Sequence, residues 1–416
     1  MSDLSERIRN LTPEQQELLR RRLQQQETRQ PESPSQRTSL TDPAPVPGPR
    51  NGLEPVVPQV RRKVEFSIFF FSADGTASVA DRYRLLTETV QFADRNGFNA
   101  IWTPERHFQA FGGLYPNPAV LSAALAVMTR NVQIRAGSVV LPLHSPVRVA
   151  EDWALVDNLS GGRAAISFAT GWHEHDYVIA PHAYHDRRER MFRDIQVVRR
   201  LWAGEEVELP GVDGKTTRVK TLPRPIQAQL PVWVTVTSPA TWKRAGEIGA
   251  NVLTALMGIT LEDLREQITE YRRARSENGH DPRTGIVSLM LHTFVGDDLD
   301  VVREKVREPL KGYLQSFIDQ FRPLMASSGG LSDSSSHEMQ SLLDFAFERY
   351  FEDSSLLGTP EKCMAMVDRL SAAGVNEAAC LVDFGIDLAS TMESLERLAA
   401  LQHHRHREIA LAAGQD

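Results

Sequence analysis

The chain has 416 residues, 41% of them hydrophobic, and a formal net charge of -7 at pH 7. This is a globular composition of a length that suits one (β/α)8 barrel with insertions, and its basic residues are too scattered to form a face for nucleic acid or an anionic membrane. The chain has two cysteines, Cys363 and Cys380, whose spacing does not suggest a pair, and it has no apolar run long enough for a signal sequence or a membrane helix. We therefore expect a cytoplasmic protein.

The first 62 residues are predicted to precede the folded domain. Apolar residues recur at helical spacing from Leu4 to Leu23, and Thr12-Pro13-Glu14 begins a second helix. Residues 28–62 are rich in Pro, Ser, Gln and Arg, which predicts a disordered linker. A helical segment over residues 1–27 on such a tether suggests docking to another protein, and an amphipathic tail without a function is the alternative.

From residue 63 to residue 410 short β-rich runs alternate with helical stretches. Eight strand-helix units predict an α/β fold, the parallel (β/α)8 TIM barrel. The strands are expected over residues 64–71, 98–103, 132–140, 164–169, 232–236, 251–254, 286–295 and 377–382. The helices are expected over residues 79–96, 117–129, 146–159, 187–202, 239–249, 261–279, 299–321, 360–373 and 391–404.

Two segments interrupt this alternation. Residues 205–223 contain Gly211-Val212-Asp213-Gly214 and predict a β-hairpin excursion. Residues 323–340 contain SSGGLSDSSSH, a polar loop between the seventh and eighth strands. A loop of that length is either disordered or a lid over the site.

The triplet Glu105, Arg106 and His107 follows the strand 98–103 directly after Pro104. Residues just past the carboxyl end of a barrel strand face the substrate, so the triplet is our candidate catalytic group. A charged surface turn is the alternative interpretation of the same residues.

Gly137 and Ser138 are small residues at positions where a strand usually has large side chains. Their small size would let a flat ring approach the backbone closely. A bulge at the barrel rim would give the same pattern.

A phosphate site is predicted around Ser238 and Thr241, which begin a helix after the strand 232–236. Ser and Thr are also ordinary N-cap residues. Thr170, Arg187 and Arg188 follow the preceding strand and begin its helix, and an arginine fork suits a phosphate monoester.

A metal site is not expected. Four histidines gather after the fourth strand, but without a supporting carboxylate their spacing does not match a zinc pattern. The chain also lacks GXSXG, a P-loop and GXGXXG after a strand, which excludes the usual hydrolase, NTPase and Rossmann patterns. The histidines are His173, His175, His182 and His185.

Several ordered blocks resemble the luciferase-like flavin monooxygenases, from about Val64 to the C-terminus. They are ERHF followed by FGG and NP, then GSVVLPLHSPVRVAEDWALVDNLSGGR, then SFATGW. The ending ERYFEDSSLLGTPEKCMAMVDRLSAAGVNEAACLVDFG is similar to a subgroup found inside or beside polyketide and nonribosomal peptide synthetases. Residues 1–27 also resemble the short helical linkers that begin modules of those assembly lines.

The resemblance implies a barrel that binds reduced FMN at its C-terminal rim and uses O2, through a C4a-peroxyflavin, to oxidise an organic substrate. The substrate would be a carrier-tethered intermediate in natural-product biosynthesis. The implied partners are a separate flavin reductase and, through residues 1–27, an acyl or peptidyl carrier protein or a synthetase; a homodimer stays open. An F420-dependent oxidoreductase on the same barrel, or a non-catalytic flavin-binding or docking protein, remains an alternative.

The family pattern also assigns roles to individual residues. Its members often hold the isoalloxazine against a non-proline cis peptide, which by alignment is Gly137-Ser138 here. The family's phosphate positions correspond to Thr170, Ser238 and Thr241, with Arg187 or Arg188 beside them. The expected walls of the pocket are Phe69, Phe71, Trp102, Phe108 and Trp172.

One departure from luciferases concerns Arg106, which stands at the position of their catalytic histidine, while His107 matches their second histidine. Arginine cannot act as a base near neutral pH, so Arg106 would instead stabilise the peroxide anion or a substrate carboxylate or carbonyl. The reactive cysteine of luciferases corresponds to Ala169, and light emission from an aldehyde is therefore not expected.

Overall fold

The computed structural model describes residues 63–71, 81–256, 258–326 and 336–413, which all belong to one unit, residues 59–416. The predictions for residues 1–27 and 28–62 and for the centre of the loop 323–340 lie outside these ranges. Within them, no helix is both long enough and apolar enough to span a bilayer.

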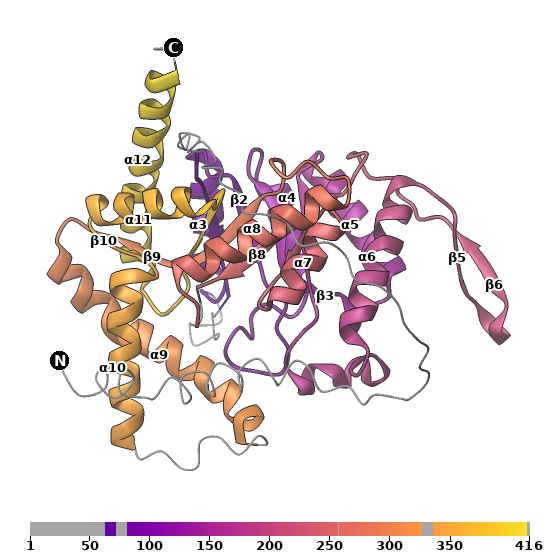
Figure 1. Cartoon of the computed structure of the whole chain (residues 1–416), viewed down its shortest axis with the longest axis horizontal. Coiled ribbons are helices and arrows are strands. Elements are labelled where there is room, and N and C mark those ends of the chain that lie inside the picture. The colour runs from indigo at the N-terminus through magenta and orange to yellow at the C-terminus, as the bar shows by residue number, and fades with distance from the viewer. Residues whose placement is uncertain (1–62, 72–80, 257, 327–335, 414–416) are drawn as a thin grey trace, which may run out of the picture. The chain divides into compact units, whose positions relative to one another are not determined.

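Eight parallel strands close into a barrel, which confirms the predicted (β/α)8 fold (Figure 1). Each strand pairs with the next in chain order, and the eighth pairs with the first, with Glu65 opposite Glu377. Parallel pairing aligns all carboxyl ends at one rim. The barrel strands are β1 (Glu65–Phe69), β2 (Ala100–Thr103), β3 (Gln133–Val140), β4 (Ala164–Ala169), β7 (Val232–Thr235), β8 (Asn251–Ala255), β9 (Val287–Val295) and β11 (Glu377–Leu381).

Helices surround this barrel, and several of them begin at residues whose side chains cap them. The Asn117 side chain accepts a hydrogen bond from the Val120 amide, and Thr260 and Asp263 form a reciprocal capping box. Gly161 and Gly204 end two helices in the left-handed conformation. The helices around the barrel are α3 (Arg84–Arg95), α4 (Pro118–Met128), α5 (Pro146–Ser160), α6 (Arg187–Ala203), α7 (Pro239–Glu247), α8 (Leu261–Glu277), α11 (Pro360–Ala373) and α12 (Leu388–Ala413).

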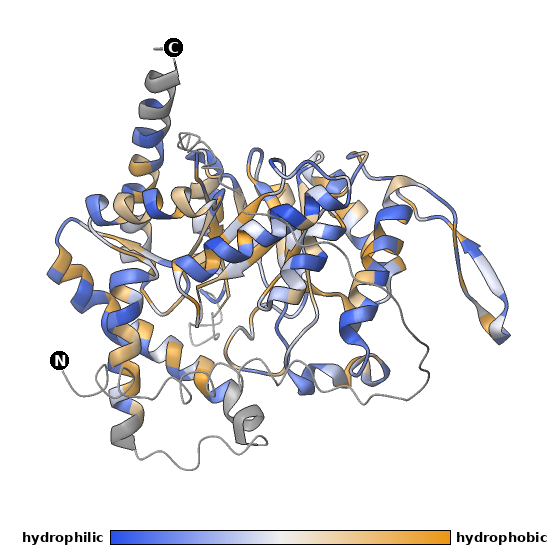
Figure 2. Cartoon of the chain, in the orientation of Figure 1, coloured by the Kyte–Doolittle hydropathy of each residue, from blue (hydrophilic) through white to orange (hydrophobic). Residues whose placement is uncertain are grey.

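The two larger apolar clusters form most of the core. Hydrophobic residues are frequent on the strands and on the helix faces that cover them (Figure 2). One cluster lies between the strands and the outer helices and includes Ile134 and Trp153. The other fills the barrel around Phe69 and Trp102. It continues without a break into α9 (Leu299–Ala326) and α10 (Ser336–Asp353), so the barrel interior and these two helices share one core.

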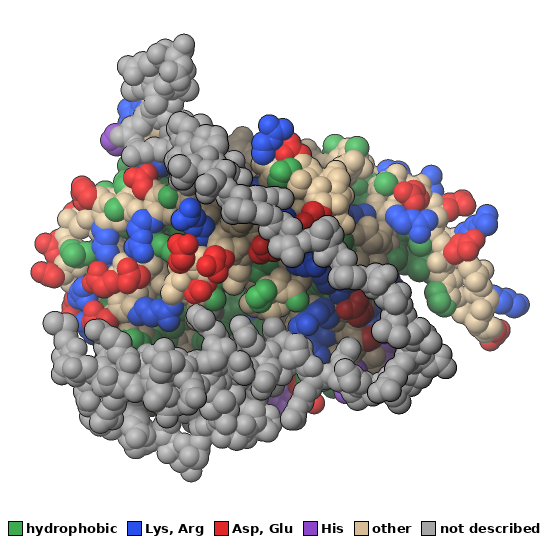
Figure 3. Space-filling view, viewed as in Figure 1, with side chains coloured by type: hydrophobic (Ala, Val, Ile, Leu, Met, Phe, Trp, Pro, Cys, Tyr) green, Lys and Arg blue, Asp and Glu red, His purple; other side chains and the backbone are tan. Residues whose placement is uncertain are grey.

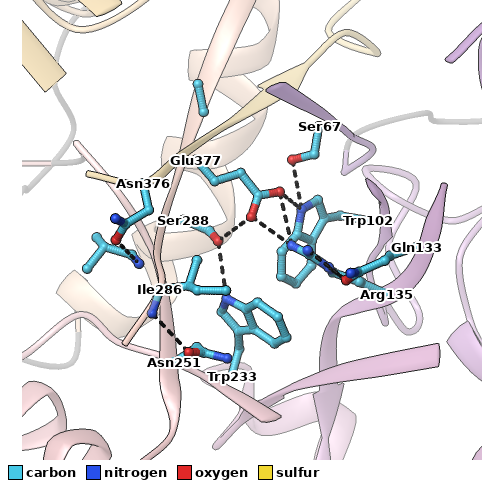
Figure 4. A network of polar contacts seen from close by, with 12 residues as sticks. Ser67, Trp102, Gln133, Arg135, Trp233, Asn251, Ile286, Ser288, Asn376 and Glu377 are labelled. Atoms are coloured by element: carbon cyan, nitrogen blue, oxygen red, sulfur yellow. Dashed lines mark hydrogen bonds and ion pairs between the residues drawn. The ribbon is translucent and has the colours of Figure 1, made fainter. Parts of the chain in front are cut away.

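A buried ion pair closes the amino-terminal end of the barrel (Figure 4). Arg135 Nη1 donates to Glu377 Oε2 at 2.7 Å, and both side chains are 1% exposed. The guanidinium lies between two indole rings, 4.7 Å from the Trp102 centroid and 4.4 Å from that of Trp233. Ser288 donates to the same carboxylate at 2.8 Å. Substrate would therefore meet a filled barrel floor and can bind only at the opposite rim.

The segments outside the eight units differ in part from the prediction. The hairpin is confirmed, as β5 (Val207–Pro210) and β6 (Thr216–Val219) pair antiparallel. The loop interpretation of residues 323–340 is wrong at both ends, because α9 continues to Ala326 and α10 begins at Ser336. Also unpredicted are α10 and β10 (Leu356–Gly358), which pairs with β9. Short 3₁₀ helices occur at η1 (Leu141–Leu143), η2 (Glu174–Val178), η3 (Pro181–Ala183) and η4 (Val212–Gly214).

Charged side chains of both signs alternate on the described part of the face seen in Figure 3. Arg303 and Arg307 of α9 both form ion pairs with Glu348 of α10, and the N–O distance of the Arg307 pair is 3.0 Å. Exposed pairs of this kind contribute little stability each, so the apolar contacts between α9 and α10 hold them together.

Candidate active site

The Glu105 carboxylate organises the carboxyl-terminal rim between β2 and β3. Its side chain is fully buried and accepts three hydrogen bonds. The Val140 amide at the end of β3 donates to Oε2 at 2.8 Å, while His107 Nε2 and His144 Nε2 contact Oε1 at 2.9 and 2.6 Å. Glu105 therefore fixes two imidazoles against one edge of the barrel mouth.

These contacts set the ionisation of the cluster. Burial alone would raise the pKa of Glu105, but the hydrogen bonds from His107 and His144 outweigh it and lower the pKa below its ordinary value. For His144, burial opposes the charged form, but the hydrogen bond and the charge of Glu105 raise its pKa overall. The rim thus favours an ionised carboxylate beside a protonated His144.

Arg106 turns away from this cluster, although it is the next residue in the chain. Its amide donates to the Tyr115 carbonyl at 2.8 Å, so residues 105–115 fold back on themselves. Gly112, at φ +79°, allows this path, because a Cβ there would lie 2.6 Å from Arg106 Cγ. The guanidinium lies over the Phe71 and Trp172 rings, at 4.9 and 5.4 Å from their centroids. The predicted triplet therefore divides into two groups with different surroundings.

The Gly137-Ser138 peptide is cis, as the resemblance predicted. A Cβ at position 137 would lie 2.9 Å from the Phe69 ring and 3.1 Å from the Trp102 ring, so glycine serves the packing of the barrel interior. The Ser138 hydroxyl contacts the Thr235 hydroxyl, which also contacts Ser167 at 2.9 Å. A chain of hydroxyls therefore crosses from β3 to β7 and β4 just inside the rim.

Ser238 and Thr241 form the start of α7, three to six residues after Thr235. The Ser238 hydroxyl accepts from the Thr241 amide at 3.4 Å, and the two hydroxyls lie 3.0 Å apart. Both residues are buried. The N-cap interpretation is therefore confirmed, and the same hydroxyls and the positive end of α7 are suited to hold a phosphate. Thr170 follows β4, and its carbonyl accepts a hydrogen bond from the Tyr177 hydroxyl.

The two candidate arginines at the start of α6 have unequal environments. Arg187 Nη1 donates to the Tyr184 carbonyl at 2.8 Å, and its guanidinium lies 4.5 Å from the Tyr184 ring centroid. Arg188 is half-buried, and its side chain has no hydrogen bond or ion pair to another residue in the described ranges. Of the two, Arg188 is free to bind an anion without breaking a contact.

The predicted aromatic walls are distributed over two levels. Phe69 and Trp102 lie inside the barrel beneath Gly137, and Phe71 and Trp172 lie at the rim beside Arg106. Phe108 is 63% exposed, so its place in the wall stays a prediction. Its backbone has φ +56°, and its ring centroid lies 5.6 Å from that of His107.

The four histidines after β4 do not come together as a metal site. His173 packs against Trp172, with ring centroids 4.9 Å apart, and His182 and His185 are exposed. Across the described part of the chain no three His, Cys, Asp or Glu side chains are arranged to hold a metal ion.

Sequence reasoning missed several residues of the rim, because each comes from a distant segment. His144 stands 39 positions after Glu105. Asp383 follows β11 and accepts from the Phe71 amide at 2.9 Å and from the Tyr115 hydroxyl at 3.0 Å. The LPLHSP and LVDFG segments that carry His144 and Asp383 were visible in the resemblance, but only the closed barrel shows their partners.

Comparison with known proteins identifies the class of enzyme. The family model described as luciferase-like monooxygenase matches residues 64–377, well over half of the chain. The chain therefore belongs to the luciferase-like monooxygenase family. It is a flavin-dependent monooxygenase of that family.

Three individual proteins show how broad the likeness is. The chain is 26% identical over 319 residues to the oxygenase component of the flavin-dependent trigonelline monooxygenase of Acinetobacter baylyi, covering 76% of this chain and 88% of the relative. The oxygenating constituent of 3,6-diketocamphane monooxygenase from Pseudomonas putida, solved in complex with FMN, superposes with a TM-score of 0.65 at 19% identity. The superposition covers 81% of this chain and 96% of that structure. An F420-dependent secondary alcohol dehydrogenase superposes with a TM-score of 0.58 at 19% identity, over 80% of this chain and 99% of that structure. The two solved structures share the fold.

Proposed function

We propose that this protein is the oxygenase component of a two-component system that uses FMN reduced by a separate reductase, together with O2, to oxidise an organic substrate. The observation that carries the proposal is the Glu105 carboxylate holding His107 and His144 at the rim, at 2.9 and 2.6 Å. The relative from Acinetobacter baylyi is named an oxygenase component, which supports a separate reductase. The name of that relative, a flavin-dependent monooxygenase, and the FMN bound in the diketocamphane enzyme support FMN as the cofactor.

The rim offers the groups that FMN requires. The phosphate would be held by Ser238, Thr241 and the N-terminus of α7, together with Thr170 and Arg188. Arg187 is the alternative arginine for this role. The isoalloxazine would lie against the Gly137-Ser138 peptide, where Ser138 is 9% exposed and its hydroxyl already contacts Thr235. Hydroxyls, a helix N-terminus and a free guanidinium are the donors that a phosphate monoester accepts from, so the residues fit this cofactor.

Reduced FMN, when bound, supplies the electrons that make O2 reactive toward the substrate. The protein contributes three other functions. His107 Nε2 donates to the ionised Glu105 Oε1, and the other ring nitrogen, Nδ1, would carry the proton that is moved at the rim. Glu105 orients that ring and, through the Val140 amide, fixes it to β3. The aromatic side chains around Arg106 exclude water from the centre of the rim.

The finer assignment concerns the substrate and the partners. We propose that the substrate is a carrier-tethered intermediate of natural-product biosynthesis and that residues 1–27 dock the carrier protein or synthetase. The support is the sequence resemblance of the ending ERYFEDSSLLGTPEKC and of the N-terminal segment. Removal of residues 1–27 is the direct test of docking, read out by co-purification with a synthetase module encoded nearby.

The cofactor assignment predicts how the protein changes flavin oxidation. Full-length protein mixed with NADH, an FMN reductase and O2 should slow the reoxidation of reduced FMN at least about tenfold, because a dry site protects bound reduced flavin from bulk oxygen chemistry. In a separate fluorescence titration, FMN should bind more tightly than F420. Unchanged FMN reoxidation, or tighter binding of F420 than of FMN, would replace our proposal by the deazaflavin alternative.

The phosphate assignment predicts a contrast between FMN and riboflavin, which differ only in the phosphate group. We expect wild type to bind FMN tighter, and Arg188→Gln to raise the Kd for FMN about tenfold while leaving the Kd for riboflavin unchanged, since a charge-assisted hydrogen bond is worth about 1.5–3 kcal/mol. Fluorescence titration measures both constants.

Arg193 provides the matched control, because it lies on the same helix and pairs with Asp194 at 2.9 Å. Arg193→Gln should not change either constant. Equal losses of FMN and riboflavin affinity in Arg188→Gln would place the phosphate elsewhere.

A further inference from the structure

Arg106 carries a buried charge that forms no ion pair with a described residue. Burial lowers its pKa, and the nearby Asp176 carboxylate opposes that effect only in part. The side chain is 8% exposed, and it has no carboxylate within ion-pair distance in the described part of the chain. Its one side-chain hydrogen bond goes to a neutral amide, from Nη2 to Gln320 Oε1 at 2.5 Å. Its Nε is buried without a hydrogen-bond partner. A buried cation normally has an anionic partner, because desolvating it alone is unfavourable.

Aromatic rings surround this guanidinium on several sides. The distances from its central carbon to the ring centroids are 4.9 Å for Phe71 and 5.4 Å for both Phe111 and Trp172. These rings come from the ends of β1 and β4 and from the segment after β2. The rings stabilise the cation in part, but they accept no hydrogen bond from Nε. The Nε–H group of Arg106 therefore remains an unused donor in an apolar environment.

A second unpartnered polar atom lies next to the same rings. The Tyr313 hydroxyl of α9 is buried and, in the described ranges, has no hydrogen-bond partner. Its ring packs edge-on against Phe111, with centroids 5.1 Å apart, and the positive charge of Arg106 lies close enough to affect the pKa of the phenol. Two donors from different elements, Arg106 Nε and the Tyr313 hydroxyl, therefore lack an acceptor in one aromatic enclosure.

A third unpartnered atom belongs to His292 of β9, whose ring packs against that of Tyr313. Their rings are perpendicular with centroids 4.4 Å apart, and His292 Nε2 has no hydrogen bond to a described residue. Burial lowers the pKa of His292 to about 3, so its imidazole is neutral and adds no second cation. Among the described side chains around it, Arg106 supplies the positive charge. Asp176 lies nearby with its Oδ1 unpartnered, but burial raises its pKa and so disfavours its ionised form, and the place beside Arg106 still favours one anionic group.

We propose that Arg106, assisted by the Tyr313 hydroxyl and by Gln320, binds a free carboxylate of the substrate, distinct from the acyl group that a carrier protein would hold as a thioester, and that the enzyme selects molecules that join such a carboxylate to an apolar or aromatic body. This inference rests on the proposed function for the statement that the bound acid is the substrate. The carboxylate accepts from Arg106 Nε and from the tyrosine, and it supplies the missing negative charge. The rings of Phe71, Phe111 and Trp172 then contact the apolar body. His107 and Glu105, which lie on the other side of the same turn, remain free for proton transfer.

The test compares an acid with its neutral isostere. Full-length protein is titrated calorimetrically at pH 7.5 with benzoate and with benzamide, in the presence and absence of FMN. We expect wild type to bind benzoate at least about tenfold tighter than benzamide, and Arg106→Met to abolish that preference. Arg106→Lys should keep part of it, because the charge remains, and Tyr313→Phe should reduce benzoate affinity several-fold.

Arg199 is the matched control, since it is another largely enclosed arginine, on α6, whose Nη1 donates to the Ile248 carbonyl at 2.7 Å. Arg199→Met should leave the preference for benzoate intact. A wild-type protein without preference for the acid, or an Arg106→Met variant that retains the preference, would overturn the inference. Because these titrations do not depend on flavin oxidation, failure of the flavin assay with a retained benzoate preference would reject the proposed function and not the anion site.

Discussion

Glu105→Gln is expected to lower kcat at least about 100-fold with any accepted substrate at saturating reduced FMN, because correct placement of a proton-transfer group contributes a factor of about 100 to 10,000. A glutamine cannot hold His107, His144 and the Val140 amide together, since only its oxygen accepts and its NH2 group meets donors. Steady-state turnover under a coupled reductase measures the loss.

Glu174→Gln is the matched control, because Glu174 is exposed and follows β4 at the same rim. We expect it to keep wild-type turnover. A Glu105→Gln variant that retains most of its kcat would show that the imidazoles are positioned by packing and not by the carboxylate.

Glu105→Gln should also lower the stability of the fold by an amount that depends on pH. The lowered pKa of Glu105 makes its contribution full above the unfolded value near 4.5, and the raised pKa of His144 makes its contribution full below the unfolded value near 6.5. The pair therefore stabilises the fold most between those values, and the effect declines as pH rises through the folded pKa of His144. We expect Glu105→Gln to lower the free energy of unfolding by about 1.5–3 kcal/mol at pH 6 and by less at pH 9, measured by urea denaturation. Equal losses at both pH values would contradict the ionised pair.

The largest effect on stability is expected from the barrel floor. Glu377→Leu leaves Arg135 charged and buried, which should lower the free energy of unfolding by about 3–5 kcal/mol. In the double variant Arg135→Met/Glu377→Leu both charges are removed, and we expect it to recover much of that loss, although Ser288 and Trp102 lose an acceptor. Urea denaturation of the wild type, the single variant and the double variant completes the comparison. A double variant as unstable as the single one would mean that the floor depends on the hydrogen bonds and not on the neutralised charge.

The barrel could be predicted from the sequence because each of its strands is a short apolar run bounded by turn residues. The run 98–103 and β2 agree to within two residues, and the whole of residues 164–169 is β4. By contrast, α10 was missed because it begins within the polar run SSSH, where composition favours a loop. Its apolar side chains, such as Phe347, have no visible partner until α9 and the barrel interior are brought beside them.

The candidate site was only partly predictable for a different reason. A motif places Glu105 and His107 near each other, since they are two residues apart. It does not show that Arg106 between them points into a separate aromatic enclosure, because that direction depends on the turn at Gly112 and on Gln320 from α9. Residues that act across the barrel become recognisable only when the strands close.

The core shared by the barrel interior and the helices α9 and α10 has a consequence for engineering. Exchanging substrate-contacting insertions between relatives is a common route to new specificity, and it works when the insertion is an independent module. Here Phe347 and Val306 belong to the same apolar cluster as Phe69 and Trp102, so a transplanted α9–α10 segment would bring foreign side chains into the centre of the recipient barrel. A chimera of this enzyme should therefore carry the interior barrel residues together with the two helices.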